Sequence, residues 1–515
     1  MGRKSNYENG MYNQLMDLMN RMDSFEKESN QKISSLNHRI DELENENAIL
    51  KTENAVLKAE NKLLKEDNAR LKSIINNDSS NTSLPPSTDQ KCGKPANTYN
   101  GREKSNRKSG GQKGRKGTTL TKADVEEKIK NGIYRPEIRN LGKVKGNHYV
   151  TKYILDLEVN PKVIELRIYP DENGKLAIPS EYRSDVTYGA NVRALAVSLY
   201  SEGVMSNDRI AAFLNAASEN TLELSEGSVY SFCRKLAENA QPSISHLETT
   251  LLNQKVVATD ATGITVNGKL NYIRNFSIQN TVVYRAMKSK AIEALEKIDF
   301  LKKYSGTLVH DHETALYHFG TEHAECNVHL LRYLRKNTEE TENQWSKKMS
   351  DLMKEINQKR KELLIQEERR FSKKELQQYE TRYKELIILG REENKKTSHE
   401  YAKSDEKTLL NRLENYKSNH LLFMYDFSVP FDNNMSERDL RKVKNRQKMS
   451  GGFRKESGNE MYCSILTIVE TLKRRNLGLI ENLKKLFVGT PAIFLRSDAC
   501  RRGRTFVMSS SVIRS

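Results

Sequence analysis

Residues 256–260 read Val-Val-Ala-Thr-Asp, an apolar run that ends in a carboxylate. Two more strand-like segments follow at Tyr272–Ile278 and Val282–Met287, and Ala291–Tyr304 has helical spacing. Residues 307–311 read Thr-Leu-Val-His-Asp, again a short apolar run that ends in an aspartate. The order strand-strand-strand-helix-strand predicts a mixed α/β sheet, with Asp residues at the ends of its first and last strands.

Residues 339–418 interrupt this α/β pattern. They contain one glycine, no proline, and dense Lys and Glu with apolar residues at helical spacing. This composition predicts a long helical hairpin inserted into the α/β domain. The chain then turns after Pro430, and we expect a capping residue at Asn434 followed by a strongly basic helix.

The basic helix carries one acid among many cations. Arg441, Lys444 and Lys448 stand 4, 7 and 11 residues after Glu437, so a continuous helix would place all four on one face. Residues 438–455 hold eight positive side chains against at most two negative ones when Glu437 is counted. A run of charges like this is ordinarily a solvated helix face with salt bridges. Here the surplus of positive charge favours binding of phosphates next to the acid.

Residues 11–76 carry a heptad repeat. Leucines occupy the d positions from Leu36 to Leu71, and the a positions from Asn47 to Asn68 are asparagine. Leu at d with Asn at a is typical of a parallel two-stranded coiled coil that gives up stability for register and partner choice. We therefore expect a homodimer or larger assembly, with a long helix packed onto its own protein as the alternative.

The stretch that follows the heptads, to about Leu120, is rich in Gly, Ser, Asn and basic residues. Within residues 102–116, seven positive side chains stand against one negative one. Such a run cannot bury enough apolar surface to fold alone. It is either a solvated linker or a flexible arm that contacts DNA phosphates through Lys113, Arg115 and Lys116.

The region before the apolar run predicts short strands and then helices. Residues 149–151 and 163–169 are β-like, and a helical segment extends from about residue 191 to 236 with a break near Glu219. Two short helices joined by a polar turn are compatible with a DNA-reading helix-turn-helix, and equally with any α-hairpin.

The composition limits the class of protein. The chain has 515 residues, too many for one hydrophobic core, and 86 Lys and Arg against 68 Asp and Glu give a formal net charge of +18. That charge suggests a polyanionic partner, most plausibly nucleic acid. No window approaches about 18 uncharged apolar residues, and five scattered cysteines form no disulfide framework. We expect a cytoplasmic protein with no membrane partner.

Three acids are the candidate catalytic residues: Asp260, Asp311 and Glu437. Two strands that end in Asp would place both carboxylates at one edge of a sheet, and an acid from a helix can close the cluster. Hard divalent cations relieve the repulsion between such carboxylates. Two ions about 4 Å apart can activate a water or a 3′-hydroxyl and stabilise the departing oxygen. The alternative is that the aspartates are ordinary turn residues.

These acids, with Lys444 seven residues after Glu437, resemble the DDE motif of bacterial insertion-sequence transposases. Phe431-Asp432-Asn433-Asn434 with Glu437-Arg438 resembles the signature of the insertion-sequence family numbered sixty-six, over roughly residues 30–490. The other segments that resemble this family are residues 310–312 (His-Asp-His), Cys326-Asn327-Val328-His329 with Arg332, residues 83–87 with their Pro-Pro, and residues 110–117 with their glycines.

The resemblance implies a ribonuclease-H-like catalytic core interrupted by a helical insertion, preceded by a mostly helical DNA-binding region and an N-terminal coiled coil. It also implies metal-dependent strand cleavage and transfer at element ends, with Asp260, Asp311 and Glu437 holding two Mg²⁺ or Mn²⁺ ions. The implied DNA contacts are Arg438, Arg441, Lys444 and Lys448. The implied partners are element ends, target DNA and small accessory proteins, in the bacterial nucleoid.

Two features depart from the family. Many members carry a cysteine-rich zinc ribbon, but no cysteine lies between Cys92 and Cys233, so no zinc ribbon is expected. Residues 496–515 are basic and Ser-rich without periodicity, and we assign them no function.

His323, Cys326 and His329 stand at three-residue spacing and could hold zinc on one helical face, although a structural or DNA-facing role is favoured.

The expected function is that of a DNA transposase of the DDE class. The alternatives are an inactive coiled-coil DNA-binding protein, such as a regulator or decayed copy, and a metal-dependent nuclease that does not join strands. The expected domains are a coiled coil at 1–78, a basic arm at 79–122, a DNA-binding region at 123–245, a catalytic core at 246–338 and 419–490 around the insertion at 339–418, and an atypical tail at 491–515.

Overall fold

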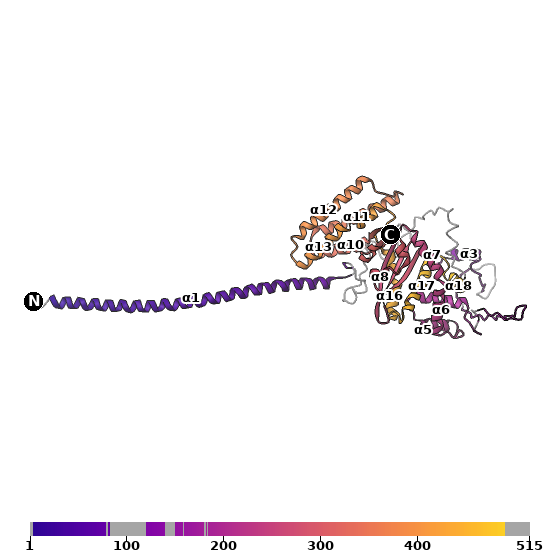
Figure 1. The fold of residues 1–515 in the computed structure, drawn as a ribbon, viewed down its shortest axis with the longest axis horizontal. Coiled ribbons are helices and arrows are strands. Elements are labelled where there is room, and N and C mark those ends of the chain that lie inside the picture. The colour runs from indigo at the N-terminus through magenta and orange to yellow at the C-terminus, as the bar shows by residue number, and fades with distance from the viewer. Residues whose placement is uncertain are drawn as a thin grey trace. The chain divides into compact units, whose positions relative to one another are not determined.

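The computed structural model describes residues 4–489, except for 79–80, 83–119, 140–149, 158, 180–181 and 183. The described chain is rich in helices and contains a mixed five-stranded sheet (Figure 1). It divides into two compact units. The first comprises Met1–Asn97, Tyr333–Lys348 and Glu385–Asn411, and the second comprises Thr98–Arg332, Met349–Lys384 and Arg412–Ser515.

The sheet lies in the second unit. Its strands are β1 (Val256–Val266), β2 (Lys269–Ile278), β3 (Thr281–Met287), β4 (Thr307–His310) and β5 (Glu322–Glu325). Their spatial order is β3-β2-β1-β4-β5, with β1–β2 and β2–β3 antiparallel and β1–β4 and β4–β5 parallel. The turn between β1 and β2 is Asn267-Gly268, and both residues have positive φ, as a tight hairpin turn requires.

The sheet differs from the sequence prediction in three ways. Strand β1 continues beyond Asp260 to Val266, because β2 pairs with it along this whole stretch, so Asp260 lies inside a strand rather than at its end. The strand β5 was not predicted, and it is only four residues long. The helix expected at Ala291–Tyr304 forms two short helices, α8 (Ile292–Leu295) and α9 (Asp299–Lys303).

One long helix covers the free edge of the sheet. The helix α17 (Glu456–Arg474) packs on β3, and its hydroxyls replace the missing strand partner. The Tyr284 N–H donates to Thr467 Oγ1 at 2.9 Å, and the Val282 N–H donates to Thr471 Oγ1 at 3.2 Å. An edge strand satisfied in this way cannot pair with another chain.

Four helices that precede or follow the sheet pack on α17: α4 (Ala190–Ser201), α6 (Glu226–Asn239), α7 (Gln241–Leu252) and α18 (Leu479–Phe487). The helix α5 (Asn207–Ala217) packs on α4 and α6. The predicted break near Glu219 is confirmed, since Glu219 and Asn220 both have positive φ. A second, unpredicted break precedes α5, which begins after the capping residue Ser206. No described helix is long and apolar enough to cross a membrane.

The strands expected near residues 149–151 and 163–169 are not formed in the described part of this region. Residues 150–157 and 159–170 have no strand pairing, and Val163 is 94% exposed. The prediction was wrong here because alternation only marks a possible strand, whereas pairing requires a partner. The helix α3 (Lys122–Lys130) precedes this region and starts with a capping box formed by Thr121 and Asp124.

The insertion is a set of five helices rather than the predicted hairpin: α10 (Asn327–Thr341), α11 (Gln344–Ile365), α12 (Lys373–Asn394), α13 (Glu400–Asn415) and α14 (Lys417–Tyr425). The turns at Glu342 and Glu367 have positive φ and end α10 and α11. Within the first unit, the buried carboxylate of Glu406 accepts hydrogen bonds from Trp345 Nε1 at 2.5 Å and from Asn343 at 2.8 Å.

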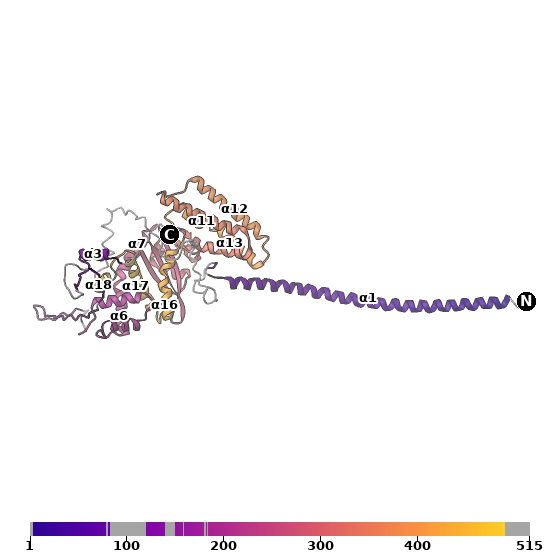
Figure 2. The same cartoon turned by 180° about the vertical axis from the view of Figure 1, so that it is seen from behind.

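The N-terminal helix α1 (Lys4–Asn76) is continuous, as both views show (Figures 1 and 2). Its d-position leucines are solvent-exposed, from 42% at Leu43 to 61% at Leu36. Its last turns contact helices of the same unit: Glu66 lies 3.4 Å from His399, and the Tyr401 hydroxyl donates to the Ala69 carbonyl. The C-terminal end of α1 therefore packs on its own protein, while its upstream leucines have no partner within the described chain.

The predicted basic helix is broken in two. The helices α15 (Asn434–Asp439) and α16 (Arg441–Ser450) meet at Leu440, so Glu437 and Arg441 belong to different helices. The N-terminal cap of α15 is Asn433 rather than the predicted Asn434, whose N–H donates to Asp432 Oδ1 at 3.0 Å.

Candidate active site

The register of the sheet places two of the predicted acids beside each other. Strands β1 and β4 run parallel, and their last paired residues are Ala258 and Val309. Asp260 on β1 and Asp311, which directly follows β4, each stand two residues beyond that last pair. Adjacent parallel strands lie about 4.8 Å apart, so the two carboxylates start from neighbouring backbones.

The charges of Asp311 and Glu437 act on Asp260. Burial, together with these two negative charges, raises the pKa of Asp260 from 3.8 to about 7, although the Ala261 N–H and the Lys290 ammonium oppose the shift. The Ala261 N–H donates to Asp260 Oδ1 at 2.7 Å. The structure therefore brings Asp260, Asp311 and Glu437 into one electrostatic cluster.

Two asparagines hold the helix of Glu437 against β1. The Asn433 side chain donates to the Thr259 carbonyl at 2.8 Å. The Asn275 side chain accepts from the Asp260 N–H at 3.0 Å and donates to the Ser436 carbonyl at 3.0 Å. Asn275 and Asn433 are buried, so these bonds are shielded from water and fix the backbone that precedes Glu437.

The far end of α15 is anchored by Asp439, which the sequence presented only as one negative charge among many positive ones. Its carboxylate accepts from Ser277 at 2.6 Å and from Asn275 at 3.2 Å, and it pairs with Arg474 on α17. The Tyr284 hydroxyl donates to the Asp439 carbonyl at 3.1 Å. Asp439 is thus a positioning residue that ties α15 to β2, β3 and α17.

The segment around Asp311 is held on both sides. His312 has a positive φ of 67°, and its Nδ1 lies 2.6 Å from Glu325 Oε1 on β5. Glu313 pairs with the buried Arg274 and, at 3.4 Å, with Lys290. A strained backbone at a site persists only where its surroundings determine it, and here His312 and its neighbour Glu313 are both fixed by side-chain contacts.

Glu325 is the centre of this network. It is buried, which would raise its pKa, but hydrogen bonds from His312 and Tyr317 and the charge of Arg412 hold that pKa well below its usual range. Tyr317 donates at 2.6 Å and the Arg412 guanidinium at 2.6 Å. Arg412 comes from α13, so the last helices of the insertion contribute directly to the support of Asp311.

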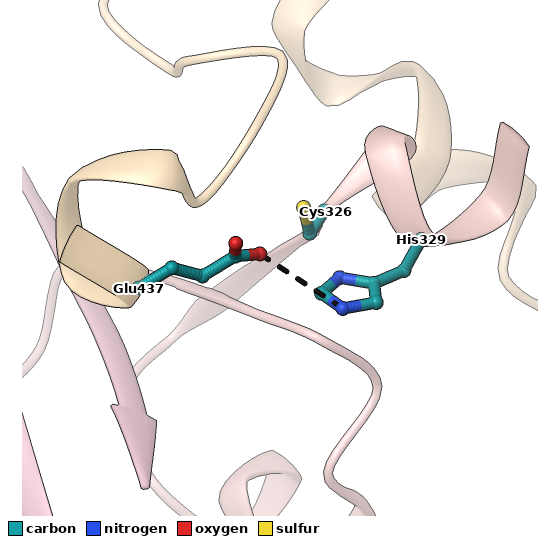
Figure 3. A group of neighbouring side chains, drawn as sticks. All are labelled: Cys326, His329 and Glu437. Carbon is teal, nitrogen blue, oxygen red and sulfur yellow. Dashed lines mark ion pairs between the residues drawn. The ribbon is translucent and has the colours of Figure 1, made fainter. Parts of the chain in front are cut away.

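A second group of donors lies beside Glu437 (Figure 3). Cys326 immediately precedes α10 and His329 lies in its first turn, and their ligand atoms and that of Glu437 are all within 4.8 Å of one another. His329 Nε2 is 3.9 Å from Glu437 Oε1. Burial lowers the pKa of His329, although the charges of Asp311 and Glu437 oppose the shift.

The zinc set considered from the sequence is not the set that the structure assembles. His323 lies on β5 and its Nδ1 is 3.2 Å from His310 Nε2, so it shares no helical face with Cys326 and His329. Burial lowers the pKa of His310 to about 3, with the neighbouring His323 adding to the shift. Glu437 takes the place of His323 in the cluster, which sequence spacing could not show because 108 residues separate it from His329.

The predicted DNA contacts on α15 and α16, Arg438, Arg441, Lys444 and Lys448, are all exposed. Two other cations of this stretch are turned inward. Lys442 pairs with Glu470 at 2.7 Å, and the buried Arg446 lies over the Tyr200 ring at 4.9 Å. The remaining predicted contacts, Lys113, Arg115 and Lys116, lie outside the described residues.

The comparisons with known proteins agree with this arrangement. A family model described as Transposase IS66 family matches residues 185–461. The matched stretch includes the whole sheet, the helical insertion, the three acids and the pair Cys326 and His329. No curated protein matches the chain.

Proposed function

The chain belongs to the Transposase IS66 family, since the match covers more than half of its length, and we propose that it performs metal-dependent strand cleavage and strand transfer at the ends of an insertion sequence. The observation that carries this proposal is the register that sets Asp260 beside Asp311, with the charge of Glu437 acting on Asp260. The mixed sheet, interrupted by a helical insertion before Glu437, supports a ribonuclease-H-like core.

The three acids fit divalent cations such as Mg²⁺ or Mn²⁺. They offer oxygen donors, which hard cations prefer. Glu437 Oε1 is buried with no hydrogen-bond partner among the described residues, and the raised pKa of Asp260 reflects burial and repulsion between carboxylates. Two bound ions would supply an activated oxygen nucleophile and stabilise the leaving oxygen of an in-line displacement.

The protein's own side chains prepare this site. Asn275 and Asn433 fix α15 against β1, and the pair His312–Glu325 fixes the backbone that carries Asp311. Catalysis of this kind depends on positioning within fractions of an ångström. The exposed cations of α15 and α16 would bind the phosphates of element ends and target DNA, while residues 123–245 would provide further DNA contacts.

The proposal is tested by removing each charge while keeping the shape of its side chain. Asp260→Asn, Asp311→Asn and Glu437→Gln should each lower Mg²⁺-dependent cleavage of DNA that bears the element ends by orders of magnitude, because metal stabilisation is worth several kcal/mol and about 1.4 kcal/mol is tenfold in rate. DNA binding should survive. The matched control is Asp299→Asn on the exposed surface of α9, which should cut normally.

Asp311→Asn cutting as fast as the parent would remove Asp311 from the site. Loss of DNA binding together with cutting would assign these acids a structural role. A separate assay with pre-cut 3′-hydroxyl ends distinguishes strand transfer from simple hydrolysis. Joined product is expected for the parent chain, cutting without joining would make it a nuclease, and no cutting by the parent would make it an inactive DNA-binding protein.

A further inference from the structure

One donor set next to the three acids is unlike a magnesium site. Cys326, His329 and Glu437 offer one sulfur, one ring nitrogen and one carboxylate oxygen (Figure 3). Thiolate and imidazole favour borderline-soft ions such as Zn²⁺, whereas Mg²⁺ takes oxygen ligands. We propose that a divalent ion of the zinc class binds Cys326, His329 and Glu437. By binding Glu437, this ion takes a carboxylate away from the magnesium site, and that competition rests on the proposed function.

The sulfur and the imidazole are placed by the backbone. The Cys326 N–H donates to the His310 carbonyl at 2.8 Å, which continues the β4–β5 pairing, and the His329 N–H donates to the Cys326 carbonyl at 3.1 Å. The two side chains stand three residues apart where α10 begins, so they lie on the same side of it. These two ligands are therefore present before any ion binds.

Burial raises the pKa of the Cys326 thiol to about 12, and a hydrogen bond from the backbone opposes that shift. Cys326 is fully buried, and the Asn433 N–H donates to its sulfur at 3.3 Å. A hydrogen bond to the charged form of a ligand favours that form. On binding, the thiol proton leaves to solvent and the sulfur–metal bond replaces the S–H bond.

The other two ligands carry polar atoms with nothing to bind. His329 Nδ1 and Glu437 Oε1 are buried and have no hydrogen-bond partner among the described residues. The other ring nitrogen of His329, Nε2, lies 3.9 Å from Glu437 Oε1, which is too long for a hydrogen bond. Buried polar atoms usually have partners. An ion bound by Glu437 and one ring nitrogen of His329, whose ligand atoms lie within 4.8 Å of each other, would give the Glu437 carboxylate a partner.

Closing the site needs a modest movement. Zinc bonds of about 2.0–2.3 Å place tetrahedral ligands about 3.5 Å apart, whereas these ligand atoms spread over as much as 4.8 Å. The Glu437 side chain is 31% exposed and has freedom to move toward the buried pair. Three protein ligands leave a fourth position open for water.

The direct test uses Co²⁺ as a spectroscopic replacement for zinc in the full-length protein. Cys92 and Cys500 are first changed to Ser, so that thiols outside the described residues cannot contribute. Metal-free protein titrated with Co²⁺ should develop a thiolate-to-cobalt charge-transfer band in the near ultraviolet, and Zn²⁺ should displace it. Cys326→Ser should abolish the band, whereas the matched change Cys463→Ser, at another buried cysteine on α17, should retain it.

A second variant guards against misfolding of Cys326→Ser. His329→Gln should weaken Co²⁺ binding by at least about tenfold, since even outer-shell changes cost that much at metal sites. Absence of the band from the parent, or its persistence in Cys326→Ser, would overturn the site. Asp260→Asn separates this site from the proposed function, because it should lose cleavage yet keep the cobalt band.

A competition experiment tests whether zinc and magnesium share Glu437 as a ligand. Zn²⁺ added to a Mg²⁺-dependent cleavage reaction should slow the parent. For each protein, the cleavage rate with zinc is divided by its own rate without zinc. The fraction of the rate that is lost should be smaller for His329→Gln than for the parent. Equal fractional inhibition of both proteins would show that zinc does not compete through this site.

Discussion

At the scale of single residues, Asp260 shows how the sheet sets the chemistry of a side chain. It lies half-buried inside β1, and burial and the charges of Asp311 and Glu437 all disfavour its ionised form. The resulting repulsion costs stability in the absence of a cation. Active sites commonly carry such destabilising groups.

The pKa of Asp260 predicts a pH-dependent stability. Between its ordinary pKa of 3.8 and its raised pKa of about 7, the folded chain keeps a proton that the unfolded chain has lost. The free energy of unfolding contributed by this group therefore falls as the pH rises through that window. Asp260→Asn should remove this effect, so its advantage over the parent in metal-free urea denaturation should grow from pH 4 to pH 7.

The control for this experiment is Asp299→Asn, whose carboxylate is exposed. Its stability relative to the parent should not change in the same way over this range. If Asp260→Asn and the parent had parallel pH profiles, the three carboxylates would not interact as the structure indicates.

Glu325 illustrates the opposite case, a buried acid that is fully paired. Glu325→Gln keeps the shape but removes the carboxylate charge that pairs with Arg412 at 2.6 Å and lies beside His312. Breaking a buried ion pair typically costs about 3–5 kcal/mol. The matched control is Glu322→Gln, the same change at an exposed position of the same strand, which should stay within about 0.5 kcal/mol of the parent. Urea denaturation at neutral pH measures both, and equal losses would contradict the role of Glu325.

At the scale of elements, the cations of helices α15 and α16 fall into two groups, one that points into the protein and one that is exposed. Lys442 and Arg446 point into the protein. Lys442 forms ion pairs with Glu470 and Glu202, and Arg446 packs against aromatic rings. Arg438, Arg441, Lys444 and Lys448 remain exposed. A count of charges along the sequence treats all these cations alike, whereas the packing of α16 separates structural ones from those available to DNA.

This division predicts different effects for two lysines of one helix. Lys444→Ala should weaken DNA binding and reduce the slope of log affinity against log salt by about one, the loss of one phosphate contact, with little change in stability. Lys442→Ala should instead lower the free energy of unfolding by about 1 kcal/mol, because it removes the ion pairs of Lys442 with Glu470 and Glu202 and leaves Glu470 with Lys473 alone. Salt titrations of binding and urea denaturation separate the two, and an unchanged salt slope for Lys444→Ala would remove it from the DNA contacts.

At the scale of the whole molecule, the helix α1 raises the question of assembly. Its last turns contact α10 and α13 of its own unit, but its d-position leucines upstream are exposed. Rows of exposed leucines at heptad spacing are stabilised when a second copy covers them. We therefore expect the chain to be dimeric or larger.

Light scattering of matched pairs of variants tests this expectation. Leu50→Asn with Leu64→Asn, both at d positions, should dissociate the assembly at micromolar concentration. Ile49→Asn with Leu63→Asn makes similar changes one residue away, at positions outside the a and d seam, and should leave the mass unchanged. A monomeric parent chain, or equal masses for both pairs, would rule out a coiled coil in this register.

Local patterns in the sequence determined much of this protein. The apolar runs at 256–260 and 307–311 predicted strands β1 and β4, heptad spacing predicted the continuous helix α1, and motif order indicated the family. These features are decided within a few residues, because strand and helix periodicity depends on near neighbours. Residues Asp260, Asp311 and Glu437 were also identified from sequence, and their catalytic role remains a prediction.

Only the tertiary structure decided how those acids are held. Asn275, Glu325 and Asp439 look like ordinary polar residues in the sequence, yet their partners lie up to 164 residues away. The short strand β5 and the exchange of His323 for Glu437 beside Cys326 and His329 depend in the same way on contacts distant in the chain. Hydrogen bonds between distant residues leave no period in a sequence, because their geometry exists only once sheet and helices have packed.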